Sequence, residues 1–174
     1  MGDADGLCPY CIEFTRTKLA DLFKTGLAAI TELDFIPSGN ARLRDDGSIA
    51  CQHGPNECAL NKAIACALAF APSQDDWFPF VECIEAKAKD DAGLDVAKAA
   101  DACAVHAGLL PSRVLGCYKG PLGDTLQRRA LERTESLVPP HKWVPWVVVN
   151  GIPLFDDFDN VATFICAAYN GYPK

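Results

Sequence analysis

The sequence predicts an α/β fold in which a long helical segment separates a helix–strand unit from a β-hairpin and a last helix. Residues 28–36 alternate between apolar and polar side chains, as in a half-buried strand. Residues 57–137 place apolar side chains at helical spacing almost throughout. Two short apolar runs within residues 146–155 are joined by Asn-Gly, a strong hairpin signal. We therefore expect one domain over residues 1–174, with residues 57–137 as a helical insertion.

The composition supports a folded domain and excludes several classes of protein. The 174 residues are 49% hydrophobic, which excludes an intrinsically disordered chain. The formal charge is −7 with scattered Lys and Arg, whereas a nucleic-acid surface needs a basic patch. No apolar run approaches the ~20 residues of a membrane span, and the first residues lack the regions of a secretory signal. We therefore expect neither nucleic acid nor a membrane among the partners.

The first elements follow from local signals. A helix is expected from Pro9 to about Lys24, because proline favours the first helical turn and apolar residues then recur at helical spacing. Gly26 ends this helix. The alternating strand of residues 28–36 follows, and a turn cluster at residues 37–40 closes it.

The second half of the chain is expected to be helical until the hairpin. Asp95 is a plausible N-cap and Pro111 a plausible first-turn residue. After two consecutive prolines the pattern changes to β-branched residues, which predict a strand, a return strand and a last helix. The expected helices are 57–70, 76–89, 95–107, 111–118, 122–137 and 157–169, and the strands are 146–149 and 152–155.

Cys8 and Cys11 lie three positions apart at the start of the first expected helix. Two thiols on a first helical turn can form a small disulfide ring, and the positive end of the helix stabilises a thiolate. In this interpretation Cys8 attacks a substrate disulfide and Cys11 resolves the mixed disulfide. A structural disulfide is one alternative. Half of a zinc site is another, and it would need a second C-x-x-C pair, which the sequence lacks.

Val144 and Pro145 provide a second indication of redox chemistry. Thioredoxin-like sites place a cis-proline loop beside the C-x-x-C pair, where its backbone binds the substrate chain as an added strand. We therefore expect a cis bond between Val144 and Pro145, and substrate binding by these two residues. The alternative is an ordinary trans proline at the start of a strand.

The other seven cysteines are expected to be structural and to brace the helical insertion. Cys58 and Cys66 are about 12 Å apart along one helix, too far for a mutual disulfide. Cys103 and Cys117 flank a turn between two helices and are a candidate pair. Because seven is odd, one thiol stays free or bonds another chain. The pairing is open among Cys51, Cys58, Cys66, Cys83, Cys103, Cys117 and Cys166.

The three histidines are isolated from one another in the sequence. His106 and His141 belong to no catalytic motif and are interpreted as structural. His53 lies between Cys51 and Cys58, and its charge could tune a nearby thiolate. No set of residues has the spacing of a metal site, so no metal is expected.

Together, these residues resemble the gamma-interferon-inducible lysosomal thiol reductase family. The C-Q-H-G-x-x-E-C element is specific to that family, whereas C-P-Y-C is shared with glutaredoxins. The resemblance extends from Cys8 to about Tyr169. It is carried by Cys8-Pro9-Tyr10-Cys11, by Cys51-Gln52-His53-Gly54 followed by Glu57-Cys58, Asn61 and Cys66, and by Val144-Pro145-Trp146 with Val149-Asn150-Gly151.

The resemblance implies a thioredoxin-like fold with a helical insertion, and reduction of protein disulfides in acidic endo-lysosomal compartments. Cys8 and Cys11 would be the catalytic pair, acting on disulfide-containing polypeptides. Small thiols would regenerate the dithiol, with no bound cofactor. The implied location is lysosomal, vacuolar or secreted, although this chain shows no signal peptide.

A thioredoxin-like fold also needs a strand leading into Cys8, central between residues 30–36 and 146–150. Only MGDADGL precedes Cys8, and this segment is short and polar. We therefore expect the N-terminal strand to be missing.

Two other functions are compatible with the cysteine pattern. One is a glutaredoxin-like or oxidase-type enzyme of the thioredoxin superfamily. A glutaredoxin lacks the insertion and the C-Q-H-G element, and the direction of the reaction depends on the reduction potential. The other is a non-catalytic secreted protein stapled by disulfides, in which Cys8 would have no chemical role.

Overall fold

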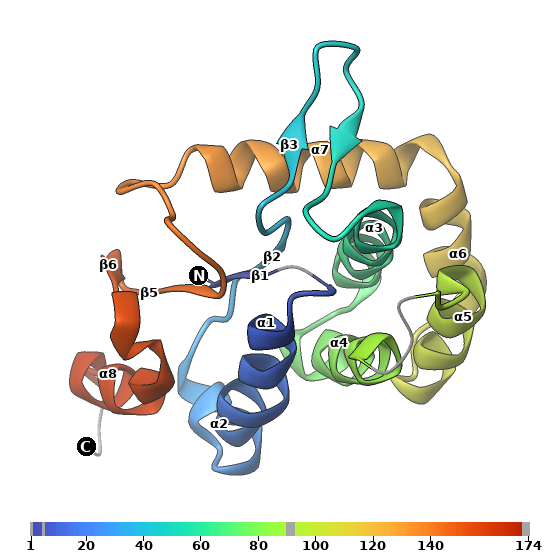
Figure 1. Ribbon diagram of the computed structural model, residues 1–174. Helices are drawn as coiled ribbons and strands as arrows, with labels where there is room; N and C mark the ends of the chain where they lie inside the picture. The colour runs from blue at the N-terminus through green and yellow to red at the C-terminus, as the bar shows by residue number, and fades with distance from the viewer. Residues whose placement is uncertain (1, 5, 90–92, 172–174) are drawn as a thin grey trace.

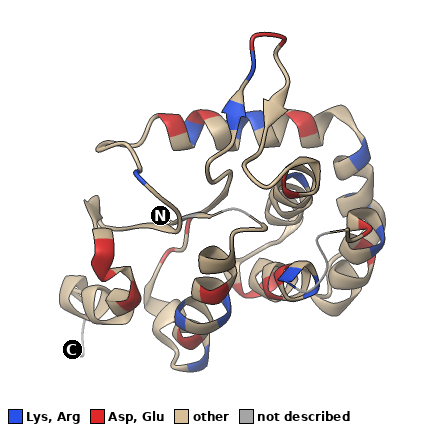
Figure 2. Cartoon of the chain, in the orientation of Figure 1, with Lys and Arg blue, Asp and Glu red and all other residues tan. Residues whose placement is uncertain are grey.

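The computed structural model describes residues 2–4, 6–89 and 93–171 of the chain. Figure 1 shows a small sheet flanked by α1 (Pro9–Phe14), α2 (Ala20–Lys24) and α8 (Val161–Ala168), with a group of helices beside it. Acidic and basic residues are interspersed along most of the helices, whereas α8 carries neither (Figure 2). The mixed α/β class predicted from the sequence is confirmed.

The sheet has four strands in the order β2-β1-β5-β6. β1 (Gly2–Ala4) runs parallel to β2 (Phe35–Pro37) and antiparallel to β5 (Trp146–Val149). β5 then pairs with β6 (Ile152–Pro153) in the expected hairpin. The strand that leads into Cys8 therefore lies in the middle of the sheet.

The expectation that the N-terminal strand is missing was wrong. β1 occupies the central place that a strand before Cys8 was expected to hold. Its backbone pairs on both sides, so its three residues need little apolar side-chain surface of their own. Gly2 N donates to Asp34 O at 2.8 Å, and Ser38 N donates to Ala4 O at 3.0 Å. Length and polarity were therefore misleading criteria for a strand with neighbours on both edges.

The strand predicted over residues 28–36 is much shorter than expected. Leu27–Ile30 form a 3₁₀-helix, which follows Gly26 with its positive φ of 80°, and β2 begins only at Phe35. The reason is a long-range contact: the Gln74 side chain binds three backbone groups of this segment, which a strand would offer to a neighbour. These groups are Ala28 O at 2.6 Å, Thr31 O at 2.9 Å and Leu33 N at 2.9 Å.

The five helices predicted between residues 57 and 137 form within about two residues of their expected ends, whereas the last one, expected over 157–169, begins only at Val161. Proline occupies the first turn of three of them, and the Asp95 side chain accepts a hydrogen bond from Lys98 N at 3.1 Å, as an N-cap should. Residues 90–92 of the predicted insertion lie outside the described residues. The observed helices are α3 (Pro55–Phe70), α4 (Gln74–Lys89), α5 (Val96–His106), α6 (Pro111–Lys119) and α7 (Pro121–Glu135).

Other boundaries differ locally from the prediction. The first helix is continuous to Lys24 but includes a π-helical turn at Thr15–Leu19. The return strand ends at Pro153 and not at 155, because a 3₁₀-helix follows at Phe155–Asn160. A short hairpin of β3 (Arg42–Leu43) and β4 (Ile49–Ala50), for which the sequence analysis predicted no element, projects above α7 (Figure 1).

Three disulfides bond six of the cysteines, Cys51–Cys58, Cys66–Cys117 and Cys83–Cys103. The candidate pair Cys103–Cys117 was therefore wrong. Although these residues lie on the neighbouring helices α5 and α6, Cys103 bonds to α4 and Cys117 bonds to α3. The expectation that one of the seven cysteines stays outside these bonds is confirmed: it is Cys166 of α8, which is exposed and therefore does not help to brace the helices.

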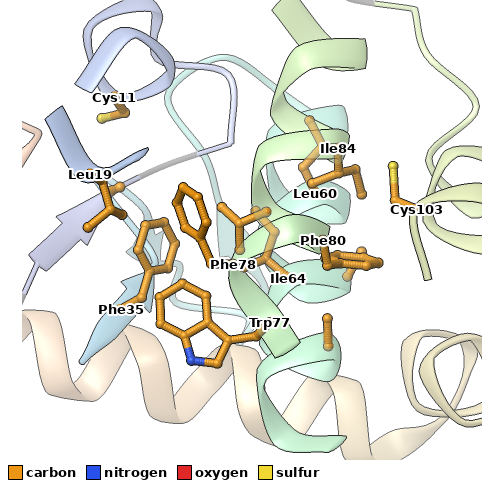
Figure 3. Close-up of a cluster of buried hydrophobic side chains, with 14 of the residues drawn as sticks. Cys11, Leu19, Phe35, Leu60, Ile64, Trp77, Phe78, Phe80, Ile84 and Cys103 are labelled. Atoms are coloured by element: carbon orange, nitrogen blue, oxygen red, sulfur yellow. The ribbon is translucent and has the colours of Figure 1, made fainter. Parts of the chain in front are cut away.

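One hydrophobic core connects the dithiol helix with the neighbouring helices. Figure 3 shows Cys11 and Leu19 at one end of the cluster, Phe80 and Cys103 at the other, and Phe78 between them. The ring of Phe78 also stacks on the ring of Phe23, which follows α1 in the same long helix, with centroids 4.0 Å apart. The position of the dithiol therefore depends on helices far away in the sequence.

The disulfides should contribute unequally to stability. The Cys66–Cys117 bond spans 51 residues and the Cys83–Cys103 bond spans 20. Loop-closure entropy gives about 4 kcal/mol for the longer loop and about 3 kcal/mol for the shorter one. We therefore expect urea unfolding to show a larger loss of unfolding free energy in Cys66→Ala/Cys117→Ala than in Cys83→Ala/Cys103→Ala.

The Cys166→Ala variant is the control for these double variants. Its side chain is exposed and outside the disulfides, so its unfolding free energy should match that of the unmodified protein. A larger loss for the Cys83–Cys103 bond would contradict the entropic argument.

Candidate active site

The dithiol lies at the start of α1, as the sequence predicts. Cys8 is the N-cap residue with an extended backbone (φ −67°, ψ 120°), and Pro9 begins the helix. Cys8 O accepts the first helical hydrogen bond from Ile12 N at 3.0 Å. Cys8 is 6% exposed and Cys11 is fully buried. Cys8 is thus the more exposed of the two cysteines.

The surroundings of Cys8 lower its pKa to about 6. The largest cause is a hydrogen bond with the Cys11 side chain. Burial opposes the shift, while hydrogen bonds of the Cys11 and Tyr10 backbone and the charge of His53 reinforce it. The first turn of α1 carries no charged side chain (Figure 2). The thiolate is therefore stabilised by a helix N-terminus and by a histidine from another element.

The loop before β5 brings Val144 and Pro145 to the dithiol. The peptide bond between them is cis, as the sequence analysis predicts. The Cys8 thiol donates to Val144 O at 3.9 Å, and both Val144 and Pro145 are buried. Two segments more than 130 residues apart in the sequence therefore meet at Cys8 Sγ. The same loop has a second cis bond, before Pro139, which sequence reasoning missed.

The loop that precedes α3 carries His53 and is closed by the Cys51–Cys58 disulfide. The His53 backbone N donates to Glu57 Oε2 at 3.1 Å, and the His53 Nδ1 forms an ion pair with the same oxygen. Glu57 is fully buried, whereas the His53 side chain is 36% exposed. The structure therefore places His53, the predicted tuning residue, where its charge acts on Cys8.

Glu57 and Asn61 are two site residues whose contacts sequence reasoning missed. They are four positions apart and so share one face of α3. Asn61 Oδ1 accepts from Gly6 N at 2.9 Å, and Asn61 Nδ2 donates to Ser38 O at 3.4 Å. Asn61 thus ties the segment before Cys8 to α3. The four-residue spacing is the signal that could have grouped them, but the sequence alone did not show what this face of α3 contacts.

The remaining histidines take no part in this site. His141 contacts Asn40 at 3.2 Å, and burial, together with the charge of Arg42, lowers the pKa of His141. His106 ends α5. Within the described ranges, no group of three or more His, Cys, Asp or Glu side chains could hold a metal ion, and no helix is long and apolar enough to cross a membrane. An apolar cavity of about 110 Å³ between the first helix and the sheet includes Pro145 but neither cysteine.

The sequence is similar to that of one known protein family and of several of its members. The sequence model of the family described as gamma interferon inducible lysosomal thiol reductase matches residues 4–107. The chain is 37% identical to a gamma-interferon-responsive lysosomal thiol protein of Arabidopsis thaliana, over 96% of this chain and 69% of that protein. It is 33% and 31% identical to gamma-interferon-inducible lysosomal thiol reductases of Carassius auratus and Mus musculus, over 96% and 98% of this chain. The chain spans 66% and 67% of those two proteins.

Replacement of Asn61 by Ala should destabilise the fold by about 1–3 kcal/mol, because it leaves the buried Gly6 N without its partner and removes one of the two hydrogen bonds that Ser38 O accepts, the other coming from Ala41 N. Chemical denaturation measures the change. Asp124→Asn is the control, since the carboxylate is 72% exposed in its ion pair with Lys62 and should contribute less than ~1 kcal/mol. Equal losses in both variants would contradict the assigned role of Asn61.

Alkylation of the reduced protein should titrate Cys8 with a midpoint near pH 6. At pH 5 a thiol of pKa 6 is about 9% thiolate, against about 0.03% for an ordinary thiol of pKa ~8.5. The fraction of thiolate is therefore roughly 300-fold higher for Cys8. Because the nucleophilicity of a thiolate falls with its pKa, each Cys8 thiolate is roughly tenfold less reactive than an ordinary one. We therefore expect Cys8 to react about 30-fold faster than glutathione with iodoacetamide at pH 5.

Mass spectrometry resolves this reaction by residue and checks that the three disulfides stay intact during mild reduction. The exposed Cys166 is the internal reference for reagent and time. A Cys8 rate equal to that of glutathione at pH 5 would contradict the lowered pKa.

Proposed function

Because the chain belongs to the gamma-interferon-inducible lysosomal thiol reductase family, we propose that it is a thiol–disulfide oxidoreductase that reduces protein disulfides at acidic pH. The observation that carries this proposal is the Cys8 thiol at the start of α1, with a pKa of about 6 and in contact with Val144 O of the cis-proline loop. We further propose that the fold is a single thioredoxin-like domain with residues 57–137 as its disulfide-braced insertion.

In the proposed reaction the Cys8 thiolate attacks one sulfur of a substrate disulfide. A mixed disulfide forms, and the other substrate sulfur leaves as a thiolate that takes up a proton. Cys11, one helical turn away, then attacks Cys8 Sγ and releases the second substrate thiol. The two electrons pass to the substrate, and Cys8 and Cys11 end as a disulfide. Two molecules of a small thiol return the pair to the dithiol form and are themselves oxidised to their disulfide.

Acid chemistry requires a thiolate where ordinary thiols are protonated. At pH 5 the ordinary thiol retains about one part in three thousand as thiolate. The contacts of Cys8 with Cys11, the helix backbone and His53 oppose protonation. This arrangement supports activity in a lysosome, which the names of the relatives indicate, or in a vacuole or secreted setting.

Substrate binding is assigned to the backbone of Val144 and Pro145. The cis bond leads directly into β5, and Val144 O lies at the reactive sulfur. An extended polypeptide beside this loop would place its disulfide next to Cys8 and add main-chain hydrogen bonds to the site. Because main-chain hydrogen bonds do not depend on the side chains of the substrate, many different sequences can bind in this way. This supports disulfide-containing polypeptides in general as the substrate class. The cysteine pair itself carries the electrons, so the proposal needs no cofactor.

Insulin reduction at pH 5, with a small thiol in excess, tests the proposal. We expect the unmodified protein to reduce insulin, Cys8→Ser to be inactive, and Cys11→Ser to accumulate a mixed disulfide with the substrate, because the resolving thiol is gone. Non-reducing electrophoresis and mass spectrometry detect the trapped species.

The Cys166→Ala variant is the matched control and should keep full activity, since this exposed cysteine lies outside the site. Unchanged insulin reduction by Cys8→Ser would favour a non-catalytic, disulfide-stapled protein. Oxidation of a reduced peptide without reduction of insulin would favour an oxidase.

A further inference from the structure

We propose that Glu57 is a positioning residue of this site: its buried carboxylate holds the His53 imidazolium in the place and charge state that act on Cys8. The inference rests on the proposed function, because it concerns the same dithiol. Glu57 is assigned no contact with the substrate or with sulfur. Its effect passes through His53.

The loop geometry fixes the position of both residues. The Cys51–Cys58 disulfide closes the loop, and Gly54, with a positive φ of 92°, turns the chain into α3. Glu57 lies in the first turn of α3 with its side chain fully buried. It binds His53 twice, at the backbone N (3.1 Å) and at the ring Nδ1. Neither the ring nor its backbone can move away without breaking a contact with the same carboxylate.

The charge of Glu57 explains why the partner is a histidine. A fully buried carboxylate is costly unless a cation or hydrogen-bond donors compensate it. Both contacts with His53 fall on Oε2, and Oε1 has no hydrogen-bond partner in the part of the chain that the structure describes. The imidazolium therefore supplies the main compensating charge, helped by the N-terminus of α3. In return, the carboxylate favours the protonated form of the ring.

The other elements around the dithiol present different groups. The loop before β5 contributes His141, which contacts Asn40, and Lys142, which lies 6.0 Å from the Phe155 ring centre. Arg42 acts on His141. On α1 the neighbours of Cys8 are the Cys11 thiol and the backbone of Tyr10. The charge of His53, from the loop before α3, lowers the pKa of Cys8, so the orientation of its ring matters for the reaction.

The experiment measures the pH profile of Cys8 alkylation in the full, reduced chain. Glu57→Gln keeps the shape and a hydrogen-bond acceptor but removes the charge. We expect this variant to lower the rate at pH 5 by roughly threefold to tenfold and to move the midpoint of the profile upward. His53→Asn should lower the rate at least as much. Asp124→Asn, which removes an exposed carboxylate paired with α3, is the control and should match the unmodified protein.

The double variant Glu57→Gln/His53→Asn separates a positioning role from an independent one. If Glu57 acts through His53, the double variant should alkylate at the rate of His53→Asn alone. An additional threefold to tenfold loss in the double variant would overturn the proposal, as would a Glu57→Gln profile equal to that of the unmodified protein.

Glu57→Asp keeps the negative charge but moves the carboxylate away from His53 by the length of one methylene group. This variant replaces Glu57→Gln in the experiment if Glu57→Gln does not fold. It should also slow Cys8 alkylation, and a rate equal to that of the unmodified protein would overturn the proposal. Circular dichroism establishes folding for every variant. Alkylation does not depend on turnover, so a failure of insulin reduction by the unmodified protein would refute the proposed function and leave the Glu57–His53 coupling measurable.

Discussion

The hydrogen bond between the side chains of Cys11 and Cys8 is the interaction on which the proposed chemistry depends most. It is the largest cause of the low pKa of Cys8, and it outweighs burial, which acts in the opposite direction. It requires Cys11 one turn into a helix that begins at Cys8. That helix is in turn held by the core that extends through Phe78 to α4 and α5 (Figure 3). The reactivity of a single sulfur therefore rests on contacts across the molecule.

The helical segment after residue 55 contributes to the site as well as to the core. α3 supplies Glu57 and Asn61 from one face. The first contacts the loop that carries His53, and the second contacts the segment that leads into Cys8. A helix, a disulfide-closed loop, a three-residue strand and a cis-proline loop thus converge on one position. Each comes from a different part of the chain.

Local signals in the sequence predicted the elements whose causes are local. Proline at first turns, Asp95 as a cap and the Asn150-Gly151 turn all acted as expected. Features that depend on distant partners were not predictable in this way. β1 forms because it has neighbours on both edges, and residues 31–34 are not a strand because Gln74 binds their backbone. The disulfide pairing likewise depends on how α3 to α6 face one another. The dithiol and its proline were recognised because motif chemistry is local, whereas the Glu57–His53 contact is a product of folding.

The burial of the disulfides also has a consequence for the proposed reductase activity, in which small thiols are the reductant. A protein with that activity must keep its own disulfides while it reduces those of its substrates. Cys66 and Cys117 are both buried, so a reductant in solution cannot reach that bridge without local unfolding. Cys51 and Cys58 are partly exposed, and their bridge closes the loop before α3. In a strongly reducing solution, damage would begin at this loop, and the protein would lose reactivity before it lost its fold.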